Sequence, residues 1–162
     1  MSVAEVKDII DRAMRTRLPG QFDSIEARVL LLATSGQEAD FQHRRQVGGP
    51  ARGLWQFEQI AVKEVLTNPV TSIYARAICV MHGVAPTITD CYLALANDDV
   101  FACCFARYNY WPVRAPLPPA RYDAVLTAYH YYDGRWKPGF ERPEDFPRYH
   151  QLALEAYGID HD

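Results

Sequence analysis

Apolar residues near the N-terminus recur with the three- and four-residue spacing of an amphipathic helix. Ser2 and Glu5 form a capping box ahead of this pattern, and Pro19 with Gly20 follows it. The face that the spacing predicts consists of Val6, Ile9, Ile10, Ala13 and Met14. We therefore expect a first helix that begins after Ser2, ends before Pro19 and turns one face to the core.

A second helix is predicted to begin at Asp23 or Ser24, either of which can cap it, and to reach Glu38. Its apolar residues are Ile25, Val29 and Leu32 on one face, with Leu30, Leu31 and Ala33 around the rest. A helix that is apolar almost all round lies inside a protein. Glu38 is therefore predicted to be a carboxyl at the end of a buried helix.

Glycine and proline divide the remaining chain into further helices and loops. Helices are predicted over residues 58–66, 71–81, 89–96, 99–108, 120–132 and 143–157. In the helix over 71–81, the pattern places Ile73, Ala77 and Val80 together on the core face. Loops are predicted at 39–52, where a small strand-and-turn excursion is the alternative, at 112–119 and at 134–142. The predicted fold class is all-α, or mainly α with a small β excursion, in a single domain over residues 1–162.

Composition narrows the classes of partner. The chain has 162 residues, of which 49% are hydrophobic, and this favours a packed core. The net charge of −3 argues against nucleic acid as a partner, because binding to the phosphate backbone needs a basic surface. The longest apolar run, residues 100–106, is far shorter than the roughly 20 residues that cross a bilayer. We expect no membrane insertion, no signal peptide and synthesis in the cytoplasm.

Cysteine and histidine give no sign of a metal site. Cys79, Cys91, Cys103 and Cys104 form no CxxC pair, and we expect free thiols in the core. The histidines His82, His130, His150 and His161 show no ligand spacing to one another. The sequence therefore predicts no metal and no cofactor.

Two short strings carry a resemblance to a known family. Fifteen residues after Glu38 begins the string Gly53-Leu54-Trp55-Gln56-Phe57-Glu58. This arrangement resembles soluble lytic transglycosylases and goose-type lysozymes, in which a catalytic Glu ends a buried helix and a Gly-Leu-Met-Gln string lines the sugar cleft. A third family string, Ala-Tyr-Asn-Ala-Gly, is similar to residues 106–110 through Tyr108 and Asn109.

The resemblance implies a lysozyme-like fold and cleavage of the β-1,4 link between N-acetylmuramic acid and N-acetylglucosamine in peptidoglycan glycan strands. Glu38 would be the general acid. In a hydrolase Glu58 would activate water from the opposite face, whereas a transglycosylase needs one carboxyl and yields a 1,6-anhydro product. Gly53, Leu54 and Gln56 would line the cleft, and Gln56 and Asn109 would hydrogen-bond N-acetyl groups. The aromatic residues that would stack on sugar faces or close the cleft are Trp55, Tyr108, Tyr110 and Trp111.

Departures from the family keep alternatives open. Ala39 stands where the family often has Ser, Trp55 replaces Met, and Tyr110 and Trp111 stand in place of the third string's small residues. One alternative is therefore a non-catalytic phage structural or cell-wall-binding protein with the same fold, and another is an unrelated helical interaction domain. Gly49-Pro50 and the aromatic C-terminal half are similar to phage-encoded members, which implies a phage particle, and other particle proteins, as the setting.

Single residues also have structural alternatives. Glu58 suits the N-terminus of a helix, Trp55 suits the core, and Tyr108 with Asn109 suits a helix end. The basic residues His43, Arg44, Arg45 and Arg52 fit either acidic groups of peptidoglycan or a solvated loop.

Overall fold

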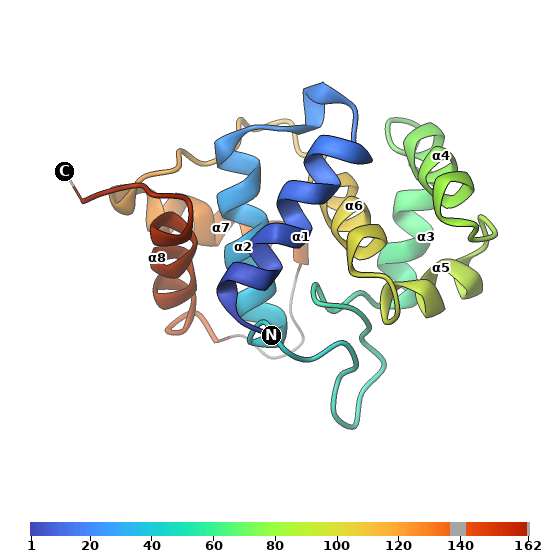
Figure 1. Cartoon of the computed structure of the whole chain (residues 1–162), viewed down its shortest axis with the longest axis horizontal. Coiled ribbons are helices and arrows are strands. Elements are labelled where there is room, and N and C mark those ends of the chain that lie inside the picture. The colour runs from blue at the N-terminus through green and yellow to red at the C-terminus, as the bar shows by residue number, and fades with distance from the viewer. Residues whose placement is uncertain (137–141, 162) are drawn as a thin grey trace.

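A computed structural model describes residues 1–136 and 142–161 of the chain (Figure 1). These residues form α1 (Val3–Thr16), α2 (Ile25–Ala39), α3 (Gln59–Thr67), α4 (Ser72–His82), α5 (Ile88–Leu95), α6 (Asp99–Tyr110), α7 (Val125–Trp136) and α8 (Phe146–Ala156), with 3-10 turns at Gly20–Phe22 and Tyr122–Ala124. Over these ranges the β structure consists of two isolated bridges, Arg45 to Arg52 and Arg52 to Phe57. The all-α prediction is confirmed.

The N-terminal helix follows the sequence pattern closely. The Ser2 side chain accepts a hydrogen bond from the Glu5 amide, and the Glu5 carboxylate accepts one from the Ser2 amide, so the capping box is present. The five residues of the predicted face are all buried. Asp11 is buried beside them and is paired with Lys7 and Arg28.

Two helices, α2 and α6, form the centre of the molecule. Both are apolar around most of their circumference; 11 of the 15 residues of α2 and 11 of the 12 residues of α6 are buried. Ser24 caps α2 by accepting a hydrogen bond from the Ala27 amide. In Figure 1, α2 lies between α8 and α1, and α6 lies between α1 and the group α3, α4 and α5. The buried apolar residues form one connected cluster to which all eight of these helices contribute.

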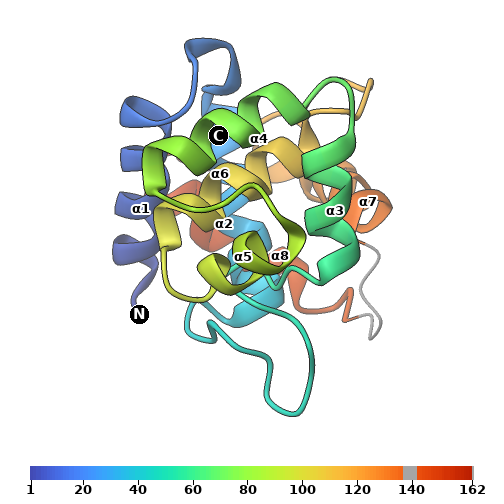
Figure 2. The same ribbon diagram turned by 90° about the vertical axis from the view of Figure 1, so that its right-hand side faces the viewer.

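The helices α3, α4 and α5 make up one end of the molecule and face the viewer in Figure 2. The predicted core face of α4 is wrong: Ile73 and Val80 are 69% and 82% exposed, and Ala77 is exposed with them. The residues of α4 that face the core are Ala75, Ile78 and Cys79. The helix carries two apolar stripes, and packing against α3 and α6 buries the stripe with Ala75 and Ile78 instead of the stripe with Ile73 and Val80.

Two helix ends also differ from prediction. Helix α6 continues to Tyr110 instead of ending at residue 108, so Asn109 is a helical residue and not a C-terminal cap. Helix α7 extends through Gly134 and Arg135 to Trp136, which were predicted as loop. Of that predicted loop, residues 137–141 lie outside the described residues.

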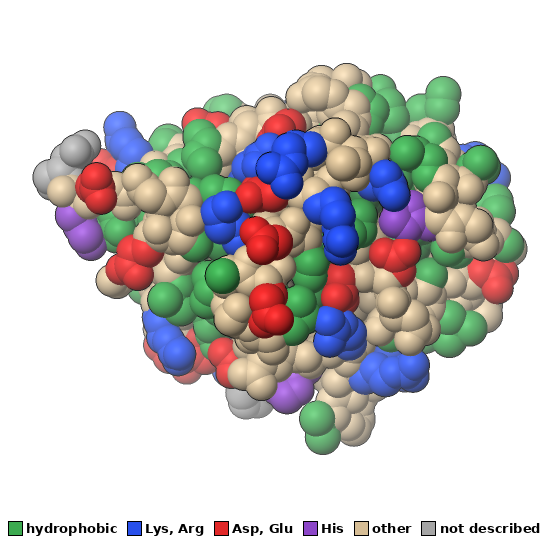
Figure 3. All heavy atoms as spheres, viewed as in Figure 1, with side chains coloured by type: hydrophobic (Ala, Val, Ile, Leu, Met, Phe, Trp, Pro, Cys, Tyr) green, Lys and Arg blue, Asp and Glu red, His purple; other side chains and the backbone are tan. Residues whose placement is uncertain are grey.

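The surface carries charges of both signs. In the face drawn in Figure 3, acidic and basic side chains alternate across α1 and the start of α2. Arg28 pairs there with Asp11 and Asp23 at 2.6 and 2.7 Å. None of the helices in the described ranges combines the length and the apolar character needed to cross a membrane.

Candidate functional site

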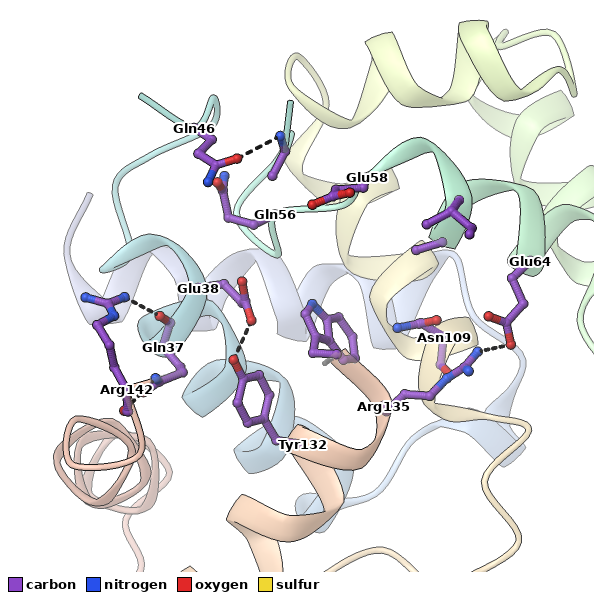
Figure 4. A pocket seen from close by; sticks show the side chains of 14 residues that line it. Gln37, Glu38, Gln46, Gln56, Glu58, Glu64, Asn109, Tyr132, Arg135 and Arg142 are labelled. Carbon is purple, nitrogen blue, oxygen red and sulfur yellow. Dashed lines mark hydrogen bonds and ion pairs between the residues drawn. The ribbon is translucent and has the colours of Figure 1, made fainter. Parts of the chain in front are cut away.

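A pocket of about 700 Å³ lies between the C-terminal end of α2, the start of α3 and the face of α7 (Figure 4). Most of its lining side chains are polar: four amides, three carboxyls, two guanidinium groups and one phenol, together with the indole of Trp136. Such a volume is in the range of small-molecule sites. The amides and carboxyls provide hydrogen-bond donors and acceptors, and the indole provides a flat apolar surface, so the lining suits a polar ligand with apolar faces, such as a sugar.

Glu38 stands at the wall of this pocket because it is the second-to-last residue of α2. Burial raises the pKa of its carboxyl from an ordinary 4.5 to about 7, since an apolar surrounding disfavours the charged form. The hydrogen bond from Tyr132 and the charge of Arg142 act in the opposite direction and limit the rise. Glu38 is thus able both to give and to take a proton near neutral pH.

Tyr132 on α7 fixes the orientation of this carboxyl. Its hydroxyl donates to Glu38 Oε1 at 2.5 Å. Burial and the nearby Glu38 charge raise the pKa of Tyr132, so the phenol keeps its proton and remains the donor. The other oxygen, Glu38 Oε2, has no hydrogen bond to the described residues and points into the pocket in Figure 4. A proton on neutral Glu38 is therefore placed on Oε2, where a ligand can receive it.

Arg142 and Gln37 brace the same end of the pocket. The Arg142 guanidinium donates to the Gln37 carbonyl, and the Gln37 side-chain amide donates to the Arg142 carbonyl, each at 2.9 Å. This reciprocal pair holds a positive charge near Glu38. It favours the carboxylate that forms when Glu38 loses its proton.

Glu58 lies on the facing wall. It is the N-cap residue of α3, is exposed, and makes no capping hydrogen bond with its side chain. Figure 4 shows the carboxyls of Glu38 and Glu58 on opposite sides of the pocket, from α2 and from the segment entering α3. The two predicted catalytic residues are thus brought to one pocket, with very different surroundings.

The turn before Glu58 depends on Gly53. Its φ of +77° is strained for other residues, and a Cβ there would lie 2.7 Å from the Leu95 carbonyl oxygen of α5. The turn directs Gln56 into the pocket lining with a φ of +48°. The Gln56 amide donates to the carbonyls of Gly53 and His43 at 2.8 and 3.0 Å. Gly53 therefore shapes the wall, and Gln56 forms part of it.

Three of the predicted substrate-binding residues lie in the core instead of in the pocket lining. Leu54 and Trp55 are 0% exposed and Tyr108 is 1% exposed. The Trp55 indole donates to the Leu31 carbonyl at 2.9 Å, and Tyr108 packs edge-on against Phe22. These rings have no face open to a sugar, so we assign them a packing role. Tyr110 is likewise buried, with its hydroxyl 2.7 Å from that of Thr34.

Asn109 lies at the end of the pocket away from Arg142. It is buried in α6 apart from the side that lines the pocket, and no hydrogen bond links its side-chain amide to the described residues. Arg135 donates to the Asn109 carbonyl and pairs with Glu64 of α3 at 2.7 Å. This arrangement fixes the Asn109 backbone while its amide stays available to a ligand.

Sequence reasoning did not assign Tyr132, Arg135, Trp136 and Arg142 to the site. The spacing of three of these residues could have indicated a shared face. Arg135 and Trp136 follow Tyr132 by three and four residues, so all three lie on one face of α7 once the helix continues through Gly134. The indole of Trp136, which is partly buried, donates to the Trp55 carbonyl at 2.8 Å, so the backbone of the buried Trp55 holds the ring that lines the pocket.

Two of the basic residues near Glu38 in the sequence, Arg44 and Arg52, make ion pairs and hydrogen bonds within the protein. Arg44 pairs with Asp99 at 2.7 Å, and Arg52 donates to the Gly49 and Ala51 carbonyls while lying over the Tyr92 ring. In the described ranges no three His, Cys, Asp or Glu side chains gather as metal ligands would. The four cysteines are free and buried, as predicted.

Comparison with protein-family models, with curated proteins and with solved structures found no match to this chain.

Proposed function

We propose that the chain is a lysozyme-like peptidoglycan glycosidase that cleaves the β-1,4 link between N-acetylmuramic acid and N-acetylglucosamine, with Glu38 as the general acid. The observation that carries this proposal is the Glu38 carboxyl, whose pKa is about 7 and whose free oxygen points into a pocket rich in amide side chains. A glycosidase needs such a group to protonate the leaving oxygen.

In the proposed reaction, the proton on Glu38 Oε2 passes to the glycosidic oxygen as the bond to the sugar carbon breaks. The Tyr132 hydroxyl and the Arg142 charge then stabilise the carboxylate that remains. In the hydrolytic route, Glu58 takes a proton from water that attacks the sugar carbon. In the transglycosylase route, Glu38 takes the proton of the sugar's 6-hydroxyl, and an anhydro ring forms.

The test is mass spectrometry of purified peptidoglycan after incubation with the protein. We expect soluble muropeptides from the parent and a loss of at least about 10²-fold in their rate of release from Glu38→Gln, because general acid catalysis contributes about that much. Glu155→Gln, an exposed carboxyl on α8 outside the pocket, is the matched control and should retain the parent rate.

The products separate the two routes. Reducing ends together with a large loss in Glu58→Gln would indicate hydrolysis, and anhydro ends with a modest loss would indicate the single-carboxyl route. A parent that releases no product from several wall types, yet binds N-acetylglucosamine oligomers, would instead be a non-catalytic wall-binding protein, which is the alternative left by the altered third string.

A further inference from the structure

Two cysteines from different helices lie in contact at the end of the molecule formed by α3, α4 and α5. Cys79 lies near the end of α4, and Cys91 lies in the middle of α5. Their sulfur atoms are 3.5 Å apart, and both side chains are fully buried. The Cys91 thiol also lies 3.5 Å from the Ala85 carbonyl in the connection between the helices. The contact therefore joins two helices that follow each other in the chain and that both pack on α3 and α6.

We infer that Cys79 and Cys91 are an oxidation site that closes to an intramolecular disulfide between α4 and α5, with a small-molecule disulfide such as oxidised glutathione as the oxidant. The sulfur atoms must approach by about 1.5 Å to reach the bond length of a disulfide. The movement needed is confined to these two helices, and the segment that connects them, residues 83–87, is mostly exposed.

Both helices lie where this movement is possible. Helix α5 has only eight residues, and α4 presents one whole face to solvent. Figure 2 shows both helices at the surface of the molecule, on the side away from α2 and α8. Opening of such a peripheral unit costs less than global unfolding and gives a small disulfide access to the buried sulfurs.

The two thiols differ in acidity, and this difference determines which thiol reacts first with the small disulfide. The hydrogen bond from Cys91 and the charge of Arg76 lower the pKa of Cys79, while the same contact and burial raise the pKa of Cys91. The Cys79 thiolate attacks one sulfur of the small disulfide, whose S–S bond breaks, and the leaving thiolate takes up a proton. Cys91 then loses its proton and attacks the Cys79 sulfur, which releases the second small thiol. Two protein thiols are oxidised and one small disulfide is reduced.

The remaining cysteines provide an internal control. Cys103 and Cys104 are neighbours in α6, where successive side chains point about 100° apart, so their sulfurs cannot join without breaking the helix. Both are fully buried, and burial raises the pKa of each thiol. They should remain reduced under conditions that oxidise Cys79 and Cys91.

The experiment treats the full-length protein with oxidised glutathione, removes the reagent, unfolds the protein in guanidinium chloride that contains iodoacetamide so that every remaining thiol is blocked, and maps the peptides by mass spectrometry. We expect a monomer that has lost two hydrogens, a cross-link between residues 79 and 91, and alkylated Cys103 and Cys104. The thermal midpoint should rise on oxidation and return with dithiothreitol, since the cross-link restricts the unfolded chain.

Single variants test the order of the steps. Cys91→Ser should stop at a mixed disulfide on Cys79, whereas Cys79→Ser should react much more slowly and form no cross-link. Four alkylated cysteines in the oxidised parent, a cross-link through residue 103 or 104, or disulfide-linked dimers would each overturn the inference. The peptide map of the parent protein tests for the cross-link between residues 79 and 91 even if a serine variant does not fold.

Discussion

Replacing Glu38 by Gln should make the protein more stable at alkaline pH and leave its stability unchanged at acid pH. Burial raises the pKa of Glu38 from 4.5 to about 7. Below pH 4.5 the carboxyl is protonated in both the folded and the unfolded chain and has no effect on the free energy of unfolding. As the pH rises from 4.5 to 7, the unfolded chain ionises first and unfolding becomes easier, and above 7 the loss of stability is complete.

The size of the effect follows from the two pKa values. The difference between 4.5 and about 7 corresponds to about 3 kcal/mol of stability that the parent loses when Glu38 ionises and that the variant keeps. Gln keeps the side-chain length and an oxygen that can accept the Tyr132 hydroxyl hydrogen bond. For a chain of this length the gain corresponds to a rise in Tm of roughly 6 to 12 °C above pH 8.

The assay is thermal or urea unfolding of parent and Glu38→Gln at several values between pH 4.5 and pH 8. Glu58→Gln is the control, because Glu58 is exposed and its replacement should change stability by less than about 0.5 kcal/mol at any of them. The reasoning is refuted if the difference between parent and Glu38→Gln is the same at both ends of the range, since the carboxyl would then not be desolvated.

Three further substitutions test other parts of the structure. Tyr132→Phe removes a hydrogen bond that favours the charged form of Glu38, so the pKa of Glu38 should rise further in an NMR titration. An unchanged pKa would mean that the phenol does not hold the carboxylate. Gly53→Ala should lower the free energy of unfolding by more than Gly83→Ala does. Both glycines have a positive φ, but only at Gly53 would the added Cβ lie 2.7 Å from a carbonyl oxygen. Equal losses of about 1 kcal/mol in the two variants would argue against this close contact. Trp55→Ala should cost about 3 to 5 kcal/mol in urea unfolding, and a stable variant with weakened sugar binding alone would return Trp55 to the cleft.

Periodicity predicted most of the helices because each one buries a stripe of apolar residues. It failed on the core face of α4, where two stripes compete: Ile73 with Val80, and Ala75 with Ile78. The sequence alone gives no preference between them. The choice is made by tertiary packing, because α4 lies against α3 and α6 with Ala75 and Ile78 buried. The buried Thr71 hydroxyl at the start of the helix also donates to the Val65 carbonyl of α3 at 2.8 Å.

The residues of the candidate site were also predicted only in part. Glu38, Gln56, Glu58 and Asn109 were predicted from short strings, and the structure places all four in the lining of one pocket. The same sequence strings also contain residues that pack behind the pocket wall. A motif does not distinguish these residues from the residues that line the pocket. Trp55 directs its indole into the core while the adjacent Gln56 lines the pocket. The opposite wall, from α7 and Arg142, lies about a hundred residues further along the chain and joins Glu38 only through packing.

The energetics of Glu38 bear on why a carboxyl stands at this position. A structural role needs only an acceptor for the Tyr132 hydroxyl, and Gln would supply one without the desolvation that raises the pKa of Glu38. The carboxyl therefore lowers stability at neutral pH and adds no contact that an amide would lack in the described structure, since its second oxygen is unbonded there. What it adds is a proton that can leave near pH 7, held at the edge of a pocket. Groups that cost stability and are oriented by their neighbours are typical of sites that carry out chemistry, and Glu38 has both properties whatever family its sequence resembles.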